Sequence, residues 1–348
     1  MKDIRYRIPK PKIEFNPPVY LCQRATKPFY LDGNINKPFW EEASFTEDFV
    51  DIQGDGMPAP RFRTRAKMLW DNDNLYFSAI LEGDEIWATV TDRDDVIFRD
   101  NDFEIFLDPD SDTQQYFEFE MNAMNTVWDL FLTKAYRDQG LAINHWDIRG
   151  LKTAVYIDGE LNNPVAKNRY WSVEVVMPFE VLKECSYEKR IPRDGEYWRV
   201  NFSRVQWLVD VKEGKYTKKI DKNTYLPYSE DNWVWAPTGV INIHYPELWG
   251  FVFFCTEEET SKSGCDLRYT IPEDEKIKWR LRTVYYAEHC FMDEKGYYTS
   301  DLSELTDLCI DGLSVIVETT KNSFEIRCLS SDNTREISLF SDGKIIIN

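Results

Sequence analysis

The sequence has little of what several common functional classes require. It contains only three His, and its seven Cys are odd in number and form no C-x-x-C pair. We therefore expect neither a disulfide framework nor a zinc site, and we interpret the cysteines as buried free thiols. No Ser or Cys lies in a recognisable nucleophile elbow, so the sequence does not support a catalytic triad.

Positive charge and long apolar runs are also scarce. The chain has 42 Lys and Arg against 61 Asp and Glu, which gives a net charge of −19. Because this charge repels phosphate backbones, nucleic acid is not an expected partner. No stretch is long and apolar enough to span a membrane, and residues 1–15 lack the apolar centre of a signal peptide. We expect a cytoplasmic protein, or a periplasmic or extracellular one if an export signal precedes this sequence. The oligomeric state stays open.

Alternating patterns are what the sequence has in abundance. Apolar and polar side chains alternate in residues 102–108 and again in 116–122, with an Asp-rich turn between the two runs. This arrangement predicts an antiparallel hairpin with one apolar face and one face of carboxylates and an amide. The polar face is either a solvated outer surface or a surface that binds a polar ligand.

Similar alternation recurs along the chain, with many turn signals and little helix, at 63–80, 151–177 and 198–205. This pattern predicts a mainly β fold, a two-sheet antiparallel β-sandwich. After Cys255 the composition changes to an acidic and Ser-Lys-rich linker, followed by one helical stripe and three short strand-like runs. The predicted division is a Pro-rich arm extended over the surface (1–29), the sandwich (30–256), the linker (257–274) and a small α+β module (275–348).

An ordered series of motifs runs through residues 30–254: LDGNINKPFW, TRAKMLWDNDNLYFSA, FRDNDFEIFLDP, YFEFEMN, WSVEVVMPFEVL, GEYWRVNFSRV and NWVWAPTGVINIHYPELWGFVFF. This series resembles the family 9 carbohydrate-binding modules, which are DOMON-type β-sandwiches. The resemblance implies the same fold and an oligosaccharide or polysaccharide as the partner. Residues 279–305 show a shorter similarity to the soluble domains of type IV pilin-like and pseudopilin proteins.

The resemblance also implies a set of binding residues. Sugar-binding members of the family hold a glycan chain end between two Trp side chains and bind its hydroxyls with polar side chains. By motif, the first aromatic platform corresponds to Phe98 and the hydroxyl-binding Glu to Glu104, and the Asn of the next strand corresponds to Asn122. The family's Arg is replaced by Glu120 and a Gln near Asn201 by Ser203.

The second Trp platform of the family falls near Ile243, so that half of the clamp is altered. Four side chains are candidates for a replacement face: Trp233, His244, Trp249 and Trp87. A different ligand, or none, is therefore implied. The full candidate set is Phe98, Glu104, Glu120, Asn122, Asn201, Ser203, Trp233 and His244.

The Asp-rich turn offers a candidate metal site. Asp108, Asp110 and Asp112 imitate the start of an EF-hand loop, but Thr113 replaces its Gly and Phe119 its terminal Glu. An EF-hand is therefore excluded. The three Asp are either an ordinary acidic turn or an irregular structural calcium site, since family 9 relatives bind structural calcium. No cofactor is required.

These observations favour a non-catalytic carbohydrate-binding protein that serves carbohydrate breakdown. A glycoside hydrolase, or a subunit associated with one, is the first alternative, because Glu118 and Glu120 lie ~7 Å apart along one strand face. The second alternative is a protein-interaction scaffold whose sugar site no longer binds sugar. We assign no catalytic residue.

Overall fold

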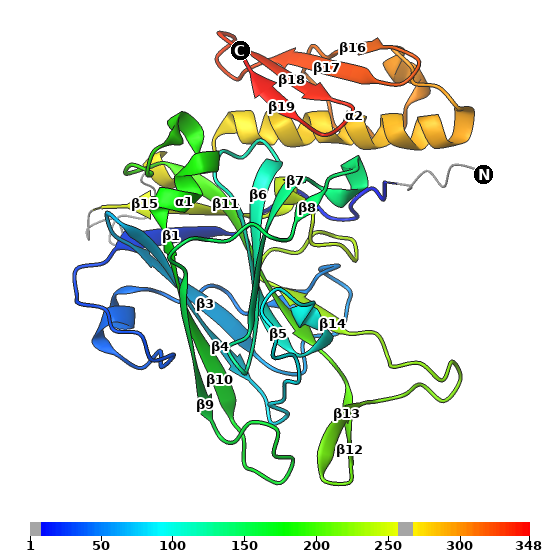
Figure 1. Cartoon of the computed structure of the whole chain (residues 1–348). Helices are drawn as coiled ribbons and strands as arrows, with labels where there is room; N and C mark the ends of the chain where they lie inside the picture. The colour runs from blue at the N-terminus through cyan, green and yellow to red at the C-terminus, as the bar shows by residue number, and fades with distance from the viewer. Residues whose placement is uncertain (1–7, 257–266) are drawn as a thin grey trace.

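A computed structural model describes residues 8–256 and 267–348 of the chain. It is mainly β, with one long helix, α2 (Glu273–Lys295), lying between a large β-structure and a small sheet (Figure 1). Among the described residues, no helix is both long and apolar enough to cross a membrane. The predicted linker falls partly on residues 257–266, which lie outside the described ranges.

The strands fall into three sheets. The largest contains β1 (Val19–Arg24), β2 (Val50–Asp51), β3 (Thr64–Trp70), β4 (Asn74–Glu82), β5 (Asp102–Asp108), β6 (Gln114–Asn122), β7 (Val127–Lys134), β8 (Ala142–Ile143), β9 (Lys152–Asp158), β10 (Tyr170–Pro178), β11 (Tyr197–Gln206), β14 (Asp231–Val234) and β15 (Gly250–Cys255). A hairpin forms from β12 (Val209–Lys212) and β13 (Lys215–Lys218), and the third sheet from β16 (Ile316–Thr319), β17 (Phe324–Leu329), β18 (Glu336–Phe340) and β19 (Ile345–Ile347). A single helical turn, α1 (Phe179–Leu182), follows β10.

The large sheet curls so that its two halves face each other. Its strand order is β8-β7-β6-β5-β11-β15-β1-β3-β4-β10-β9, with β14 and β2 attached beside β11. The pairs are antiparallel except at β1, which runs parallel to both β15 and β3. The predicted mainly β sandwich is confirmed, and hydrogen bonding continues from one of its layers to the other through β1.

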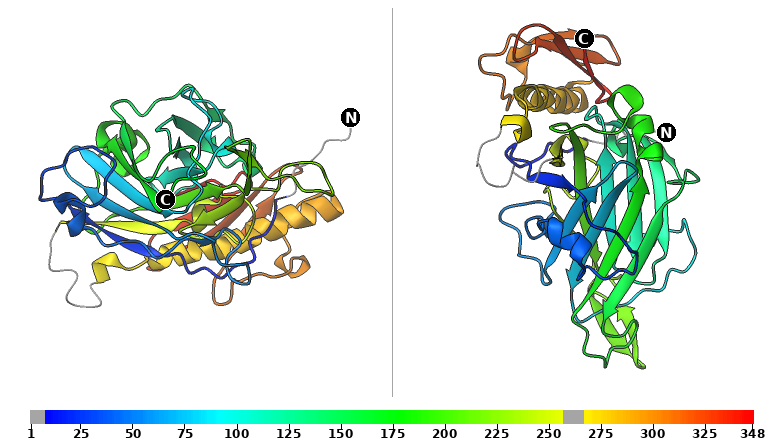
Figure 2. Two further views of the ribbon diagram at one scale, coloured as in Figure 1. Left: turned by 90° about the horizontal axis from the view of Figure 1, so that it is seen from below. Right: turned by 90° about the vertical axis from the view of Figure 1, so that its left-hand side faces the viewer.

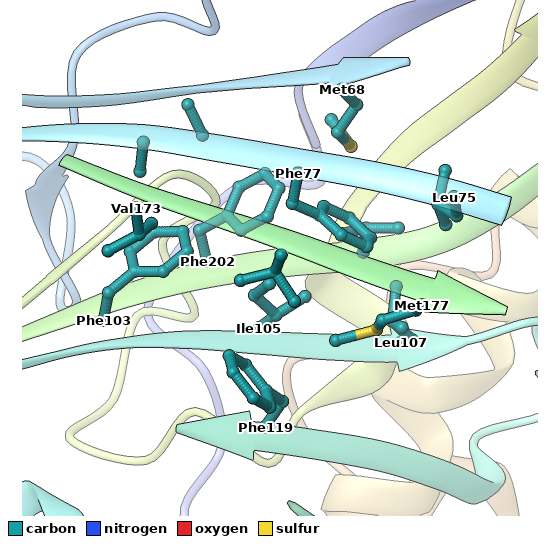
Figure 3. Close-up of a cluster of buried hydrophobic side chains, with 14 of the residues drawn as sticks. Met68, Leu75, Phe77, Phe103, Ile105, Leu107, Phe119, Val173, Met177 and Phe202 are labelled. Carbon is teal, nitrogen blue, oxygen red and sulfur yellow. The ribbon is translucent and has the colours of Figure 1, made fainter. Parts of the chain in front are cut away.

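The core fills the space between the two halves of the sheet. Inward side chains of β3, β4 and β10 meet those of β5, β6 and β11 (Figure 3), among them Met68, Phe77, Val173, Phe103, Ile105, Phe119 and Phe202. These are the apolar positions of the alternating runs, and burial of one face fixes the register of each strand. The polar positions of β5 and β6 therefore point to the opposite, outer side.

The structure corrects the prediction made for the N-terminal arm. The sequence predicts that residues 1–29 run extended over the surface, but residues 19–24 form β1 between β15 and β3. Tyr20 and Cys22 enter the main core. The strand could not be recognised from the sequence, because the five prolines in the first 29 residues favour an extended chain without strand pairing.

The C-terminal strands pair only with one another among the described residues, and α2 separates them from the sandwich (Figures 1 and 2). The apolar side of α2 packs against β17 and β18 and also against Tyr245 and Leu248 of the sandwich. Its C-cap is Gly296 in the left-handed conformation, which needs no Cβ. The expected helix and strands are present, with β19 as an additional strand. The domain boundaries themselves stay a prediction.

One buried carboxylate fastens the segment before β2 to the sheet. Glu174 of β10 is fully buried and forms an ion pair with Lys37 at 2.8 Å. It also accepts hydrogen bonds from the Trp40 indole and from the backbone N–H groups of Asp32 and Gly33. Four donors thus converge on one carboxylate, so the turn that pins Trp40 in the core has a fixed position.

We expect Lys37→Met to lower the free energy of unfolding by about 3–5 kcal/mol, because it leaves Glu174 buried without its cation. Chemical denaturation followed by tryptophan fluorescence measures this change. The control is Lys27→Met, whose pair with Glu41 is 40% and 70% exposed and should contribute about 0–1 kcal/mol. Equal losses in the two variants would contradict the expectation.

Candidate functional site

A pocket of about 490 Å³ lies on the outer face of β5 and β6. Carboxylates from these strands form its floor, and the segment 241–244 closes one side. Its lining residues are Ile52, Phe98, Glu104, Glu118, Glu120, Trp128, Tyr136, Val205, Glu230, Asn232, Ile241, Asn242, Ile243 and His244.

The floor follows from the strand register. Glu104 of β5 lies opposite Glu120 of β6 and opposite Ser203 of β11. Because side chains alternate along a strand, Glu118 lies on the same face as Glu120, two residues away on β6. Asp102 lies on the same face as Glu104, two residues away on β5. The carboxylates therefore gather on the outer face for the same reason that Phe103 and Phe119 gather in the core.

These carboxylates are buried although they face outward. Glu104 and Glu118 are each 6% exposed and Glu120 is 1% exposed. Burial raises the pKa of Glu104 to about 7, partly offset by a hydrogen bond from Ser203. Burial, and then the neighbouring carboxylates, raise the pKa of Glu120 well above its usual range. The expectation of a solvated outer face is thus wrong at this position, because the overlying segments exclude water.

Aromatic side chains form the rim of the pocket. Phe98, in the short turn η2 (Ile97–Arg99), is 40% exposed, and Tyr136 is 44% exposed. Trp128 of β7 lies beside Glu120 in register, and its indole N–H is buried without a hydrogen-bond partner. The pocket therefore combines exposed aromatic faces, an unused donor and several acceptors.

The structure brings part of the predicted set together in this pocket, namely Phe98, Glu104, Glu120 and His244. His244 is held by a 2.9 Å hydrogen bond between its Nδ1 and the Tyr116 hydroxyl. Burial, and then the charge of Arg137, lower the pKa of His244 to about 3, so the ring is neutral at pH 7. This agrees with a hydrogen-bonded structural histidine at the pocket wall.

Two predicted site residues are buried amides outside the pocket lining. The Asn122 side chain bonds the backbone of Val90, Met124 and Thr126 and the carboxylate of Asp100. The Asn201 side chain bonds the backbone of Phe202 and Ala236. Both amides are thus used to shape loops and lie outside this pocket's lining, so their role in binding stays a prediction.

Ser203 and the candidate tryptophans also lie behind the pocket. Ser203 hydrogen-bonds Glu104 and so positions it. Trp233 is 3% exposed and contacts the guanidinium groups of Arg61 and Arg204. Trp249 and Trp87 are buried as well. None of these three rings lines this pocket, and a second platform formed by one of them stays a prediction.

Trp128, Tyr136 and Glu118 are among the lining residues that the sequence did not identify as ligand contacts. The sequence does contain a signal for Trp128, because the alternation in 127–134 places its side chain on the same face of the strand as Leu130 and Leu132. The sequence contains no such signal for Tyr136, because its position depends on the turn that follows β7.

The Asp-rich turn lies away from the pocket, against α2. Asp108 is fully buried and accepts hydrogen bonds from the backbone N–H groups of Ser111 and Thr113. The Ser111 hydroxyl donates to Glu275 of α2 at 3.1 Å. The turn is thus a contact surface for the C-terminal helix. A structural calcium ion at Asp108, Asp110 and Asp112 stays a prediction.

A buried ion pair holds the segment 241–244, here called the wall segment because it closes one side of the pocket. Arg137 donates to both carboxylate oxygens of Glu247, at 2.8 and 2.9 Å, and to the carbonyl oxygen of His244 at 2.9 Å. Burial opposes ionisation of Glu247, but Arg137, Arg282 and a hydrogen bond from Tyr286 outweigh it and lower its pKa to about 2. Glu247 is therefore a carboxylate at all ordinary pH values.

Comparison with known proteins gives a match for part of the chain. Residues 31–156 match the family described as "Carbohydrate family 9 binding domain-like". This span contains Phe98, Glu104, Glu118, Glu120, Trp128 and Tyr136. The resemblance inferred from the motifs is thus confirmed. No curated protein matches the chain.

Similar solved structures include a candidate carbohydrate-binding protein from Bacteroides uniformis, at 12% identity and a TM-score of 0.49, covering 69% of this chain and 100% of that one. A family 9 module from Caldicellulosiruptor kristjanssonii in complex with cellotriose has 12% identity and a TM-score of 0.43, covering 71% of this chain and 99% of that one. A structure of such a module from the same organism with glucose has 13% identity and a TM-score of 0.41, covering 69% and 98%.

We expect Glu247→Gln to lower the free energy of unfolding by about 3–5 kcal/mol at pH 7, because Arg137 loses its buried partner. The folded-state pKa of Glu247 lies below its ordinary value, so its stabilisation is complete above about pH 4.5 and disappears as the pH falls toward about 2. The deficit of the variant should shrink over this range.

Urea denaturation at a series of pH values measures the deficit. Glu196→Gln is the control, since the Arg190–Glu196 pair is 23% and 40% exposed and should contribute about 0–1 kcal/mol. A deficit that stays constant between pH 4.5 and 2 would show that the Glu247 charge is not what stabilises the wall.

Proposed function

We propose that this protein binds carbohydrate, without hydrolysing it, in the pocket between Phe98, Tyr136 and the carboxylates of β5 and β6. One observation carries the proposal: exposed aromatic rings and buried carboxyl oxygens line a single pocket, within the segment that matches a carbohydrate-binding family. An oligosaccharide or the end of a polysaccharide chain is the proposed ligand. Its binding would serve carbohydrate breakdown by keeping the protein on its glycan.

The chemistry of the pocket suits a pyranose ring. Such a ring has an apolar C–H face, which stacks on an aromatic side chain, and a rim of hydroxyls, which bind charged acceptors strongly. Phe98 is the proposed platform at the rim, and Glu104 and Glu120 are the proposed acceptors at the floor. Tyr136 and Trp128 supply aromatic surface in place of the second tryptophan, whose position falls near Ile243.

A glycoside hydrolase is the alternative with a physical argument in its favour, because Glu104 has a pKa of about 7 and could act as an acid. The arrangement argues against it. Hydrolytic carboxyl pairs stand about 5–9.5 Å apart on either side of the scissile bond. Here Glu118 and Glu120 lie on the same face of one strand and line the same pocket. Two carboxyls on one floor do not flank a bound sugar on two sides, which supports binding over turnover.

At pH 8, where Glu104 with its pKa of about 7 is mostly ionised, we expect Glu104→Ala to weaken glycan binding by about one to two decades, because a hydrogen bond to a charged group contributes ~1.5–3 kcal/mol. Phe98→Ala should weaken it by less, since stacking adds roughly 0.5–1.5 kcal/mol beyond buried area. Calorimetry with glucose, cellotriose and xylotriose measures both effects. Tyr225→Ala, which removes an 82% exposed ring outside the pocket, is the matched control.

Two results would contradict this proposal. Binding that is unchanged in both Glu104→Ala and Phe98→Ala would place the ligand elsewhere on the protein. Absence of binding across these sugars and a wider glycan panel would favour an interaction scaffold with a decayed site. Release of reducing ends from xylan, lost in Glu118→Gln and Glu120→Gln, would instead support the hydrolase.

A further inference from the structure

Three carboxylates at the floor of the pocket converge on one point. Asp102, Glu104 and Glu120 each offer an oxygen, and these oxygens all lie within 4.8 Å of one another. The three side chains are 0%, 6% and 1% exposed. The charged groups that act most strongly on Asp102 and Glu120 are other carboxylates. Like charges so close together in a dry environment require neutralisation.

A second observation shows unused ligand capacity at the same place. The Oδ1 atom of Asp102 accepts a hydrogen bond from the backbone N–H of Val205 at 3.2 Å, but its Oδ2 atom is buried and has no partner. The Oε2 atom of Glu118, on the same floor, is also buried without a partner. A buried oxygen without a donor is costly, so these atoms favour the binding of a positively charged group.

The other carboxylate clusters of the described residues are supplied with donors. In the group of Asp94, Asp129 and Asp147, the guanidinium of Arg93 forms ion pairs with all three. In the turn at 108–112, backbone N–H groups satisfy Asp108. The cluster at the pocket floor has only one backbone donor to Asp102, the Ser203 hydrogen bond to Glu104 and one backbone donor to Glu120, from Phe98.

We propose that Asp102, Glu104 and Glu120 bind a divalent cation that prefers oxygen ligands, with Ca²⁺ the best match. Oxygens that lie within 4.8 Å of one another can surround one Ca²⁺ ion at 2.3–2.6 Å, and Ca²⁺ accepts carboxylate ligands in flexible geometry, whereas Mg²⁺ demands a near-ideal octahedron. This site is distinct from the Asp-rich turn at 108–112.

The ion would not be enclosed by protein alone. Glu104 and Glu120 line the pocket, so the remaining coordination positions face its interior. Groups that enter the pocket can take these positions, and two neighbouring hydroxyls of a glycan would suit them. The cation site itself does not depend on the pocket's ligand being a carbohydrate.

The full 348-residue chain, freed of metal with a chelator, allows a direct test. Terbium serves as the probe, because Trp128 and Tyr136 line the same pocket and can sensitise its emission. We expect saturable terbium emission that Ca²⁺ displaces, with a Ca²⁺ dissociation constant of roughly 10⁻⁴–10⁻³ M, as for a site with few protein ligands. Calorimetry with Ca²⁺ gives the stoichiometry without a probe.

The variants Glu120→Gln and Glu104→Gln should each weaken this binding at least about tenfold, because each removes a charged ligand. Both should also raise the melting temperature of the metal-free protein, since they remove one of several like charges. Asp110→Asn is the matched control in the Asp-rich turn and should leave the pocket ion bound.

Three outcomes would overturn the proposal. The first is no saturable binding of Ca²⁺ or terbium to the folded chain, which would mean that protons alone neutralise the cluster. The second is unchanged binding in both Glu120→Gln and Glu104→Gln. The third is binding that Asp110→Asn abolishes while the pocket variants retain it. None of these measurements uses a sugar, so failure of carbohydrate binding is a separate result.

Discussion

Arg137 and Glu247 form an ion pair whose side chains are only 3% and 5% exposed, directly behind the segment that closes the pocket. The guanidinium also bonds the carbonyl of His244 and lies 4.0 Å from the ring of Tyr245. A pair of this kind adds little net stability over an apolar replacement, but loss of one partner is costly. The ion pair therefore acts mainly on geometry. It holds the wall segment in the position in which the charges of Arg137 and Glu247 are paired.

The C-terminal helix completes this arrangement. Tyr286 of α2 donates a hydrogen bond to Glu247, and Tyr285 donates one to Asp138, the residue next to Arg137. The same helix contacts the β5–β6 turn through Glu275, which accepts from the hydroxyl of Ser111. Residues far from the pocket in sequence thus fix both its wall and one end of the strands beneath it. The small α+β part of the chain thus supports the pocket, although the side chains that line the pocket come from the sandwich.

Much of the sandwich was predictable, because alternation is a local property. The faces of Phe103 and Glu104, and the hairpin at 102–122, follow from period-2 patterns alone. Asn122 and Asn201 lie outside the pocket lining for a physical reason: motif position gives the strand and face of an amide, but not whether backbone groups already use its hydrogen bonds. Burial of Glu104 and Glu120 was also hidden, since it depends on a wall segment more than a hundred residues away.

The same alternation that builds the core also determines what the pocket can accept. On an open surface, Glu104, Glu118 and Glu120 would be solvated and would interact weakly with one another. Covered by the wall segment, they repel anions strongly and favour protons, cations or neutral molecules rich in hydroxyl donors. A glycan with free carboxylates or phosphates would meet this repulsion at once. The buried acidic side chains therefore disfavour anionic groups in this pocket, and a bound divalent cation would offset only part of their charge.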